Sequence, residues 1–297
     1  MNLDGYLRAG RIASEVRERA RKKYHVGSTL FEICESVESQ IREKGAEPAF
    51  PVNTSLNEIA AHYTAEPNDQ ITVKEGDILK IDIGVHVDGY IADTAVTVCY
   101  DPKYGLMVKA AEAALAEAVR MARINTKASD IGKVIEGIIT KMGYKPIQNL
   151  SGHSLQQYVI HAGKSIPNIW TFGSSFGLLG TEAYAIEPFA TTKDGLGIVR
   201  DGKVKNIFGI TSRKPSKDSD ADRLLEHIWA KYKTLPFALR WLTKDYEEAR
   251  LRSLIETLLK KKNVHAYPIL VEGNGRMVVQ AEHTIIPNES GATVITG

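Results

Sequence analysis

Two runs of strand-forming residues joined by Asp88-Gly89 constrain the fold of this chain more than any other segment. Residues 77–93 read DILKIDIGVHVDGYIAD, and an Asp-Gly pair between two extended runs favours the two-residue turn of a β-hairpin. Across such a turn Val87 pairs with Tyr90, and every pair farther along the strands follows from that one. The sequence therefore predicts the register of the hairpin as well as the hairpin itself.

Two aspartates lie inside these otherwise apolar strands, and the register places both on the same face. Asp82 is expected opposite Ala95. Asp93 is expected opposite Gly84, which makes the two aspartates diagonal neighbours with Cα atoms roughly 7–8 Å apart. We expect Gly84 to leave space that any side chain would fill. Two divalent ions about 3.5–4 Å apart would fit between the carboxylates. The alternative is that both aspartates are edge or solvent-facing residues.

Further candidate ligands lie downstream, each within an apolar or extended run. They are His153 and His161 in GHSLQQYVIHAG, Glu187 in AIEPF and Glu282 in VVQAEH. Each is weak evidence alone, because a histidine in a strand is more often a hydrogen-bonded core residue and a glutamate before proline more often ends a loop. Together with the aspartates they form a carboxylate and imidazole set, which suits Mn, Fe, Co or Zn rather than a thiolate site.

The composition is that of an ordinary globular protein, with 43% hydrophobic and 25% charged residues among 297. A formal net charge of +2 gives no electrostatic reason to expect nucleic acid or an acidic membrane as the main partner. The first residues lack the apolar core of a signal peptide and no run approaches ~20 apolar residues, so we expect a cytoplasmic protein. Cys34 and Cys99 have apolar neighbours and are interpreted as free buried thiols.

The remaining pattern predicts helices and extended segments in a repeated order. Helices are expected over residues 3–23, 28–44, 104–123 and 128–142, and extended segments over 49–63 and 77–98. Ser28 is expected to be the N-cap of the second helix. Gly45 and Gly143 should end their helices, and each is followed by a proline, an extended segment and a histidine. This echo indicates two related halves that face one another.

Residues 205–262 are charged and helical and interrupt a region rich in strands. We interpret them as a helical insertion subdomain within a larger domain made of residues 1–204 and 263–297. A nucleic-acid-binding role is the alternative, but the acidic stretch at Asp218, Asp220 and Asp222 favours packing or a lid.

The segments DILKIDIGVHVDGYIAD, GHSLQQYVIHAG, AIEPFAT and QAEHTII, in that order, resemble the type II methionine aminopeptidases in their short, archaeal-like form. The resemblance covers nearly the whole chain. It implies an α/β (α+β) pita-bread fold, in which two pseudo-symmetric halves share a β-sheet core with outer helices, plus a helical insertion.

The resemblance also implies the roles of individual residues. The five metal ligands match Asp82, Asp93, His153, Glu187 and Glu282, of which Asp93 and Glu282 bridge two divalent ions (Co, Mn, Fe or Zn). Catalysis falls to His62, His161 and Glu187, with Glu187 as general base and acid and both histidines in contact with substrate. The methionine pocket draws on Phe50, Ile160 and Tyr267.

The implied activity is hydrolytic removal of the initiator methionine from nascent proteins whose second residue is small. Such an enzyme is expected to be a monomer that associates at most transiently with the ribosome and binds no membrane. One alternative is an X-Pro dipeptidase or aminopeptidase on the same fold, which usually carries an extra N-terminal domain. The other is a non-catalytic pita-bread interaction protein, which should lack the ligands.

Overall fold

The computed structural model describes residues 2–172 and 176–297. Its helices are α1 (Leu3–Lys23), α2 (Leu30–Glu43), α3 (Gly105–Met121), α4 (Ala128–Lys141), α5 (Ser219–Tyr232) and α6 (Glu248–Lys260), with short 3-10 helices η1 (Pro102–Tyr104) and η2 (Leu239–Trp241). Its strands are β1 (Glu47–Pro48), β2 (Asn53–Leu56), β3 (Ile59–Ala61), β4 (Ile78–Val87), β5 (Tyr90–Cys99), β6 (Lys145–Pro146), β7 (Ser151–Leu155), β8 (Ser165–Pro167), β9 (Ala183–Ile186), β10 (Phe189–Thr191), β11 (Val199–Asp201), β12 (Ile207–Ile210), β13 (Phe237–Ala238), β14 (Val264–Tyr267), β15 (Leu270–Glu272), β16 (Val278–Gln280), β17 (His283–Asn288) and β18 (Gly291–Val294).

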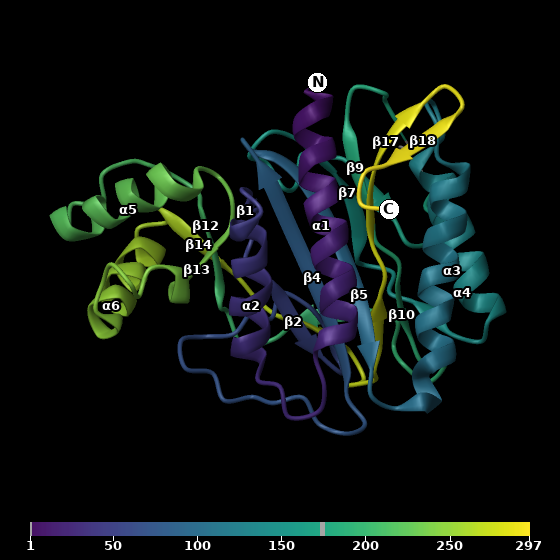
Figure 1. Ribbon diagram of the computed structural model, residues 1–297, viewed down its shortest axis with the longest axis horizontal. Helices are drawn as coiled ribbons and strands as arrows, with labels where there is room; N and C mark the ends of the chain where they lie inside the picture. The colour runs from purple at the N-terminus through teal and green to yellow at the C-terminus, as the bar shows by residue number, and fades with distance from the viewer. Residues whose placement is uncertain (1, 173–175) are drawn as a thin grey trace.

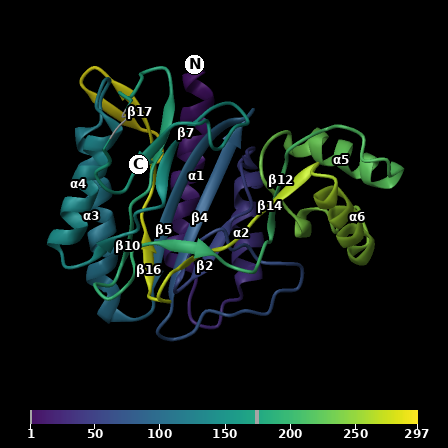
Figure 2. The same ribbon diagram turned by 180° about the vertical axis from the view of Figure 1, so that it is seen from behind.

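The strands form a central layer with a pair of helices on either flank. Helix α1 lies against β4 and β5, and α2 lies beside α1 against β1 and β2, whereas α3 and α4 lie together beyond β10 and β16 (Figure 1). Helices α5 and α6 stand apart at the opposite end, and the view from behind in Figure 2 shows the same separation. Among the described residues, no helix is both long enough and apolar enough to span a membrane.

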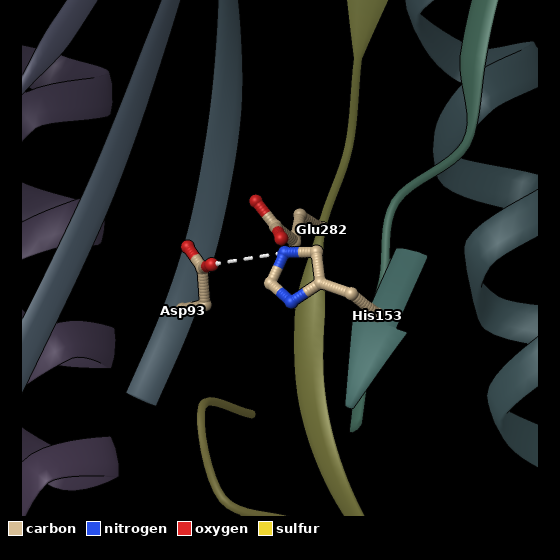
Figure 3. A group of neighbouring side chains, drawn as sticks. All are labelled: Asp93, His153 and Glu282. Atoms are coloured by element: carbon tan, nitrogen blue, oxygen red, sulfur yellow. Dashed lines mark ion pairs between the residues drawn. The ribbon is translucent and has the colours of Figure 1, made fainter. Parts of the chain in front are cut away.

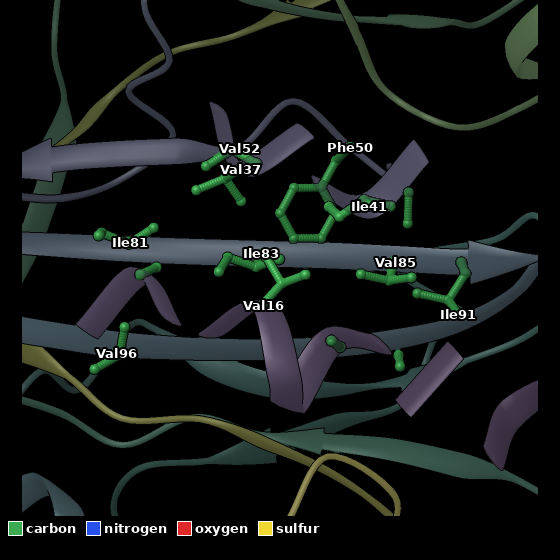
Figure 4. Packing of buried hydrophobic residues seen from close by; sticks show 14 of the residues in the cluster. Val16, Val37, Ile41, Phe50, Val52, Ile81, Ile83, Val85, Ile91 and Val96 are labelled. Carbon is green, nitrogen blue, oxygen red and sulfur yellow. The ribbon is translucent and has the colours of Figure 1, made fainter. Parts of the chain in front are cut away.

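The predicted hairpin register is confirmed. Strands β4 and β5 are antiparallel, and their register pairs Asp82 with Ala95 and Gly84 with Asp93. The two turn residues have φ angles of 52° and 85°, as the favoured hairpin turn with two positive φ angles requires. On the other face of β4, Ile81 and its alternate neighbours pack against α1 and α2 (Figure 4). The apolar face therefore fixes the hairpin on the helices and leaves the aspartates on the face that points away from them.

The second helix begins one residue later than predicted. Ser28 is not its N-cap, because Thr29 caps it instead: Thr29 Oγ1 accepts from the Glu32 backbone N–H at 3.1 Å. Glu32 Oε2 in turn accepts from the Thr29 N–H at 3.2 Å. Of Ser28 and Thr29, only Thr29 has a glutamate three positions later, and this reciprocal pair of hydrogen bonds is the stronger signal for the start of the helix. The helix ends as predicted, with Gly45 just beyond it at a φ of 74°.

The two halves repeat the same local structure, as the sequence echo predicted. Helices α2 and α4 are both followed by a positive-φ glycine, Gly45 and Gly143, and then by the two-residue strands β1 and β6. Strand β1 pairs with β4 in the first half, and β6 pairs with β10 in the second. The segments that follow β1 and β6, which carry Phe50 and Asn149, line one common cavity.

Helices α5 and α6 have an apolar cluster of their own. It includes Leu224, Ile228, Leu254 and Leu258, and it packs on the sheet β13–β12–β14. Because β12 pairs with β14, that sheet extends to Tyr267, beyond the 205–262 segment read from composition. The two cysteines are free, but Cys99 is only partly buried because it lies at the end of β5.

Candidate metal centre

A cavity of about 340 Å³ lies between the two halves and is lined by every site residue that the sequence pointed to. Five are the proposed ligands, Asp82 on β4, Asp93 on β5, His153 on β7, Glu187 between β9 and β10, and Glu282 between β16 and β17. The others are Phe50, His62, Ile160, His161 and Tyr267. Residues from both halves therefore meet in one place.

Three of the proposed ligands converge closely. Asp93, His153 and Glu282 each offer one ligand atom, and these atoms all lie within 4.8 Å of one another (Figure 3). The His153 Nε2 atom is 3.6 Å from Asp93 Oδ2 and 3.5 Å from Glu187 Oε1. Such spacing is too long for good hydrogen bonds and leaves room for a cation between the donors.

The charges at this centre are poorly compensated by the protein itself. Burial raises the pKa of Asp82 to about 6. Burial and the neighbouring carboxylates raise the pKa values of Asp93 and Glu282 well above their usual range. The pKa of Glu187 is likewise raised by burial and by Asp82. Burial lowers the pKa of His153 to about 3, so its imidazole is neutral and able to bind a metal.

The same residues fit a divalent cation. Within the part of the chain that the structure describes, the buried Oδ1 atoms of Asp82 and Asp93 have no hydrogen-bond partner. Buried polar atoms without partners are rare and call for an ion or a water. A cation would satisfy both oxygens and would offset the repulsion among four carboxylates, which is the electrostatic reason to assign a metal centre here.

Gln280 is a site residue that the sequence reading did not single out. Its side-chain Nε2 donates to Asp82 Oδ2 at 3.2 Å and lies 3.4 Å from Glu282 Oε2. The Thr97 hydroxyl accepts a hydrogen bond from the backbone N–H of Gln280 at 2.9 Å and donates one to its carbonyl at 2.6 Å. The available signal was its position two residues before Glu282 in an extended run, where side chains point to the same face.

Threonine hydroxyls join the two segments that carry Asp93 and Glu282. Between these segments the backbone makes only an isolated bridge, Ala95 with Glu282. The Thr284 hydroxyl contacts both the N–H and the carbonyl of Asp93, at 2.8 and 2.7 Å. The Thr94 hydroxyl donates to the Glu282 carbonyl at 2.8 Å. Side chains thus do the work that a regular strand ladder does elsewhere.

The two histidines outside the ligand set are neutral and oriented. His62 has a φ of 67°, which is rare for a residue with a side chain and is typical of functional sites. Its Nδ1 lies 3.2 Å from the Pro268 carbonyl, which can only accept, so Nδ1 carries the proton and Nε2 is an acceptor. Burial lowers the pKa of His62, and burial together with His62 lowers that of His161 to about 4.

The space beside Gly84 is not empty as expected. A Cβ atom at Gly84 would lie only 2.3 Å from Phe50 Cε1, so the ring of Phe50 already fills that space. The reason is the pairing of β1 with β4, which carries the chain directly after β1 over this glycine. Gly84 therefore makes room for a wall of the cavity.

Comparison with known proteins identifies the relatives of this chain. The pattern of "Metallopeptidase family M24" matches residues 4–211. A methionine aminopeptidase from Pyrococcus horikoshii is 46% identical over 296 residues, and one from Methanocaldococcus jannaschii is 44% identical over 299, each covering 100% of both chains.

Solved structures share the fold at lower identity. A thermophilic Arx1 superposes with a TM-score of 0.83 at 17% identity, covering 99% of this chain and 90% of that one. A methionine aminopeptidase from Thermotoga maritima gives a TM-score of 0.71 at 20% identity, covering 99% and 96%. These likenesses concern the fold alone, and with the sequence match they establish the pita-bread architecture.

Proposed function

Because the chain belongs to metallopeptidase family M24, within its archaeal-type methionine aminopeptidases, we propose that it hydrolyses the bond after the N-terminal methionine of polypeptides with a small second residue. The observation that carries the proposal is the group of four carboxyls and one neutral imidazole in the wall of the cavity. Newly made polypeptides in the cytoplasm are its substrates in this proposal, with at most transient contact with the ribosome.

The enzyme uses divalent metal, as its family and its ligand cluster indicate. We propose that two ions bind, held by Asp82, Asp93, His153, Glu187 and Glu282. Asp93 and Glu282, two of the three residues whose ligand atoms converge, would serve both ions, as the family resemblance implies. Bound cations would supply the nucleophile by lowering the pKa of a bound water toward about 7. Mn, Fe, Co and Zn all suit such a donor set.

Glu187 is the proposed general base and acid. Its side chain is 13% exposed, and burial together with Asp82 raises its pKa above the usual range of a glutamate, which is the direction that suits a group that must accept and return a proton. It would take the proton released by the attacking water and deliver it to the leaving amine. This role typically contributes ~10²- to 10⁴-fold to the rate.

The two neutral histidines would both contact the scissile peptide, one as a hydrogen-bond donor and the other as an acceptor. His161 would donate a hydrogen bond to the carbonyl oxygen as that atom gains negative charge. His62 would accept a hydrogen bond from the peptide N–H, because its Nδ1 proton is engaged by Pro268 and only Nε2 is free to accept. The positive φ of His62 supports this assignment, since such strain persists where it is functionally required.

Phe50, Ile160 and Tyr267 are the proposed walls of the methionine pocket. All three line the cavity, and Phe50 and Ile160 are buried. The flexible, polarisable thioether of methionine suits an apolar pocket with aromatic walls. Tyr267 also lies edge-on to the His62 ring, at 5.7 Å between centroids, so the pocket and the peptide contact are adjacent.

Peptide hydrolysis separates this function from its alternatives. Metal-loaded protein is incubated with Met-Ala-Ser and with an Ala-Pro peptide, and the products are identified. We expect free methionine from the first peptide and no cleavage of the second. Cleavage of Ala-Pro alone would indicate an X-Pro peptidase, and no product from either would indicate a non-catalytic protein.

A further inference from the structure

A buried ion pair joins the segment that carries α5 and α6 to the rest of the molecule. Glu38 on α2 and Arg240 in η2 are in direct contact, and their side chains are 0% and 1% exposed. Glu38 Oε1 also accepts from the Val52 N–H at 3.1 Å, and Oε2 accepts from the indole N–H of Trp241 at 2.6 Å. The carboxylate is therefore fully engaged, with partners on both sides of the joint.

On the core side, this joint lies directly behind the cavity wall. Val52 stands between Phe50 and Asn53, which both line the cavity. Arg240 Nη2 also donates to Thr64 Oγ1 at 3.1 Å, and Thr64 follows His62 by two residues. A shift of Glu38 or Arg240 would thus be transmitted within two residues to groups that face the substrate.

The other side of the joint also leads to the cavity. Pro236, four residues before Arg240, lines it, as does Ile207. The residue before Ile207 is the buried Asn206, whose side chain donates to the Thr64 carbonyl at 2.8 Å. Strand β12 pairs Ile207 with Tyr267, the third cavity residue from this side.

We propose that Glu38 and Arg240 are positioning residues that set the width of the methionine pocket. They hold the wall formed by Ile207, Pro236 and Tyr267 at a fixed distance from the wall formed by Phe50. The inference rests on the proposed function. In this inference, the segment that carries α5 and α6 supplies one wall of the pocket, and the ion pair fixes the position of that wall.

An ion pair suits this task because its geometry is specific. Apolar packing of the same volume would be comparably stable, but it would permit small displacements between the two parts. Glu38 instead accepts three hydrogen bonds. One comes from the backbone N–H of Val52, just before β2, and two come from the side chains of Arg240 and Trp241 in η2. A single relative position of the two walls satisfies all three.

The test compares three variants with the metal-loaded wild type. They are Glu38→Gln, Trp241→Phe and the double variant Glu38→Gln/Arg240→Met, which leaves no unpaired buried charge. Folding is checked by thermal unfolding, and metal affinity by calorimetry. Kinetics are measured on Met-Ala-Ser and on its norleucine and leucine analogues. A misplacement of about 1 Å can lower the catalytic rate on the order of 10²-fold. Because the displaced wall also contacts the substrate side chain, we expect KM for Met-Ala-Ser to rise about tenfold or more.

Two further results are expected if the joint positions the pocket. Metal affinity stays within about twofold of wild type, because no ligand is touched, and discrimination between methionine and leucine at the first position weakens. Arg252→Ala is the matched control. The Arg252–Glu66 pair links the same two parts at 3.1 Å, but its side chains are 41% and 43% exposed. Exposed pairs contribute little, so KM should stay unchanged.

The outcomes distinguish the inference from the proposed function. If the wild type releases no methionine, the proposed function fails first. If the wild type is active and the folded variants keep its KM and its discrimination, the inference alone is wrong. An equal rise of KM in Arg252→Ala would also overturn it, because the buried pair would then have no special role. Should Glu38→Gln not fold, Trp241→Phe and the double variant decide the matter.

Discussion

Substitution of Gly84 by alanine should create a steric clash with the Phe50 ring while leaving the metal centre intact. The new Cβ would lie 2.3, 2.5 and 2.9 Å from Cε1, Cδ1 and Cζ of the ring. Carbon atoms in contact prefer roughly 3.5–4.0 Å, so the ring must withdraw by about 1 Å or more. Phe50 is 7% exposed and belongs to the same buried cluster as Val37 and Val52 (Figure 4), so its ring can withdraw only toward the cavity that it lines.

The expected cost follows from this overpacking. Inserting a methyl group into a well-packed core typically destabilises by ~1–3 kcal/mol. For a large domain each kcal/mol lowers Tm by roughly 2–4 °C. The ladder that positions Asp82 and Asp93 is made by backbone groups, which an alanine in a strand does not break. We therefore expect lower Tm and a KM raised about tenfold or more, with metal binding close to wild type.

The assay is a double-mutant cycle between Gly84→Ala and Phe50→Leu. The smaller leucine removes the ring atoms that clash, so the double variant should recover stability with a coupling of ~0.5–3 kcal/mol. Tm, KM for Met-Ala-Ser and metal stoichiometry are measured on all four proteins. Strictly additive effects, or loss of metal in Gly84→Ala with KM unchanged, would refute the argument that Gly84 serves the pocket wall.

Three other predictions concern the metal centre. Asp82→Asn and Glu282→Gln should be inactive mainly because they lose metal, which metal analysis after dialysis measures; full occupancy in an inactive variant would contradict this. His62→Ala should keep its metal while kcat/KM falls ~10²- to 10³-fold, whereas His153→Ala should lose metal; equal metal loss in the two variants, seen by calorimetric titration, would mean that His62 is a ligand. Metal loading near pH 6 should release protons, because burial raises the pKa of Asp82 to about 6 and that of Glu282 above its usual range; apparent affinity should therefore rise as pH increases through 6, and an affinity independent of pH in calorimetry would be inconsistent with buried, protonated carboxyls.

The features that could be read from the sequence depend on local chemistry. The hairpin register follows from the turn at Asp88-Gly89, so the shared face of Asp82 and Asp93 was predictable from a short segment. The other ligands were assigned through the family resemblance, because His153 by itself looks like any core histidine. Local patterns fix neighbours in sequence, and resemblance supplied the distant ones.

The features that escaped prediction depend on contacts between distant segments. Nothing in the strand pattern indicates that Phe50 covers Gly84. Glu38 lies on the buried stripe of α2, next to Val37, and a charged residue there signals a buried partner. That partner is Arg240, 202 positions away, and no helical period reveals which cation it is. The tautomer of His62 likewise depends on the distant carbonyl of Pro268.

The threonine contacts between β5 and the segment around Glu282 also determine when the enzyme becomes competent during its own synthesis. Asp82 and Asp93 emerge early and can form their hairpin at once, but Glu282 and Thr284 are made about 190 residues later. Until then Asp93 lacks the hydroxyl that holds its backbone, and the ligand set lacks a carboxylate. We therefore expect an unfinished chain to bind metal ions poorly, and we expect a chain that ends before Glu282 and Thr284 to be inactive. On this reasoning, stable metal loading would follow completion of the chain, because Glu282 and Thr284 are among its last residues.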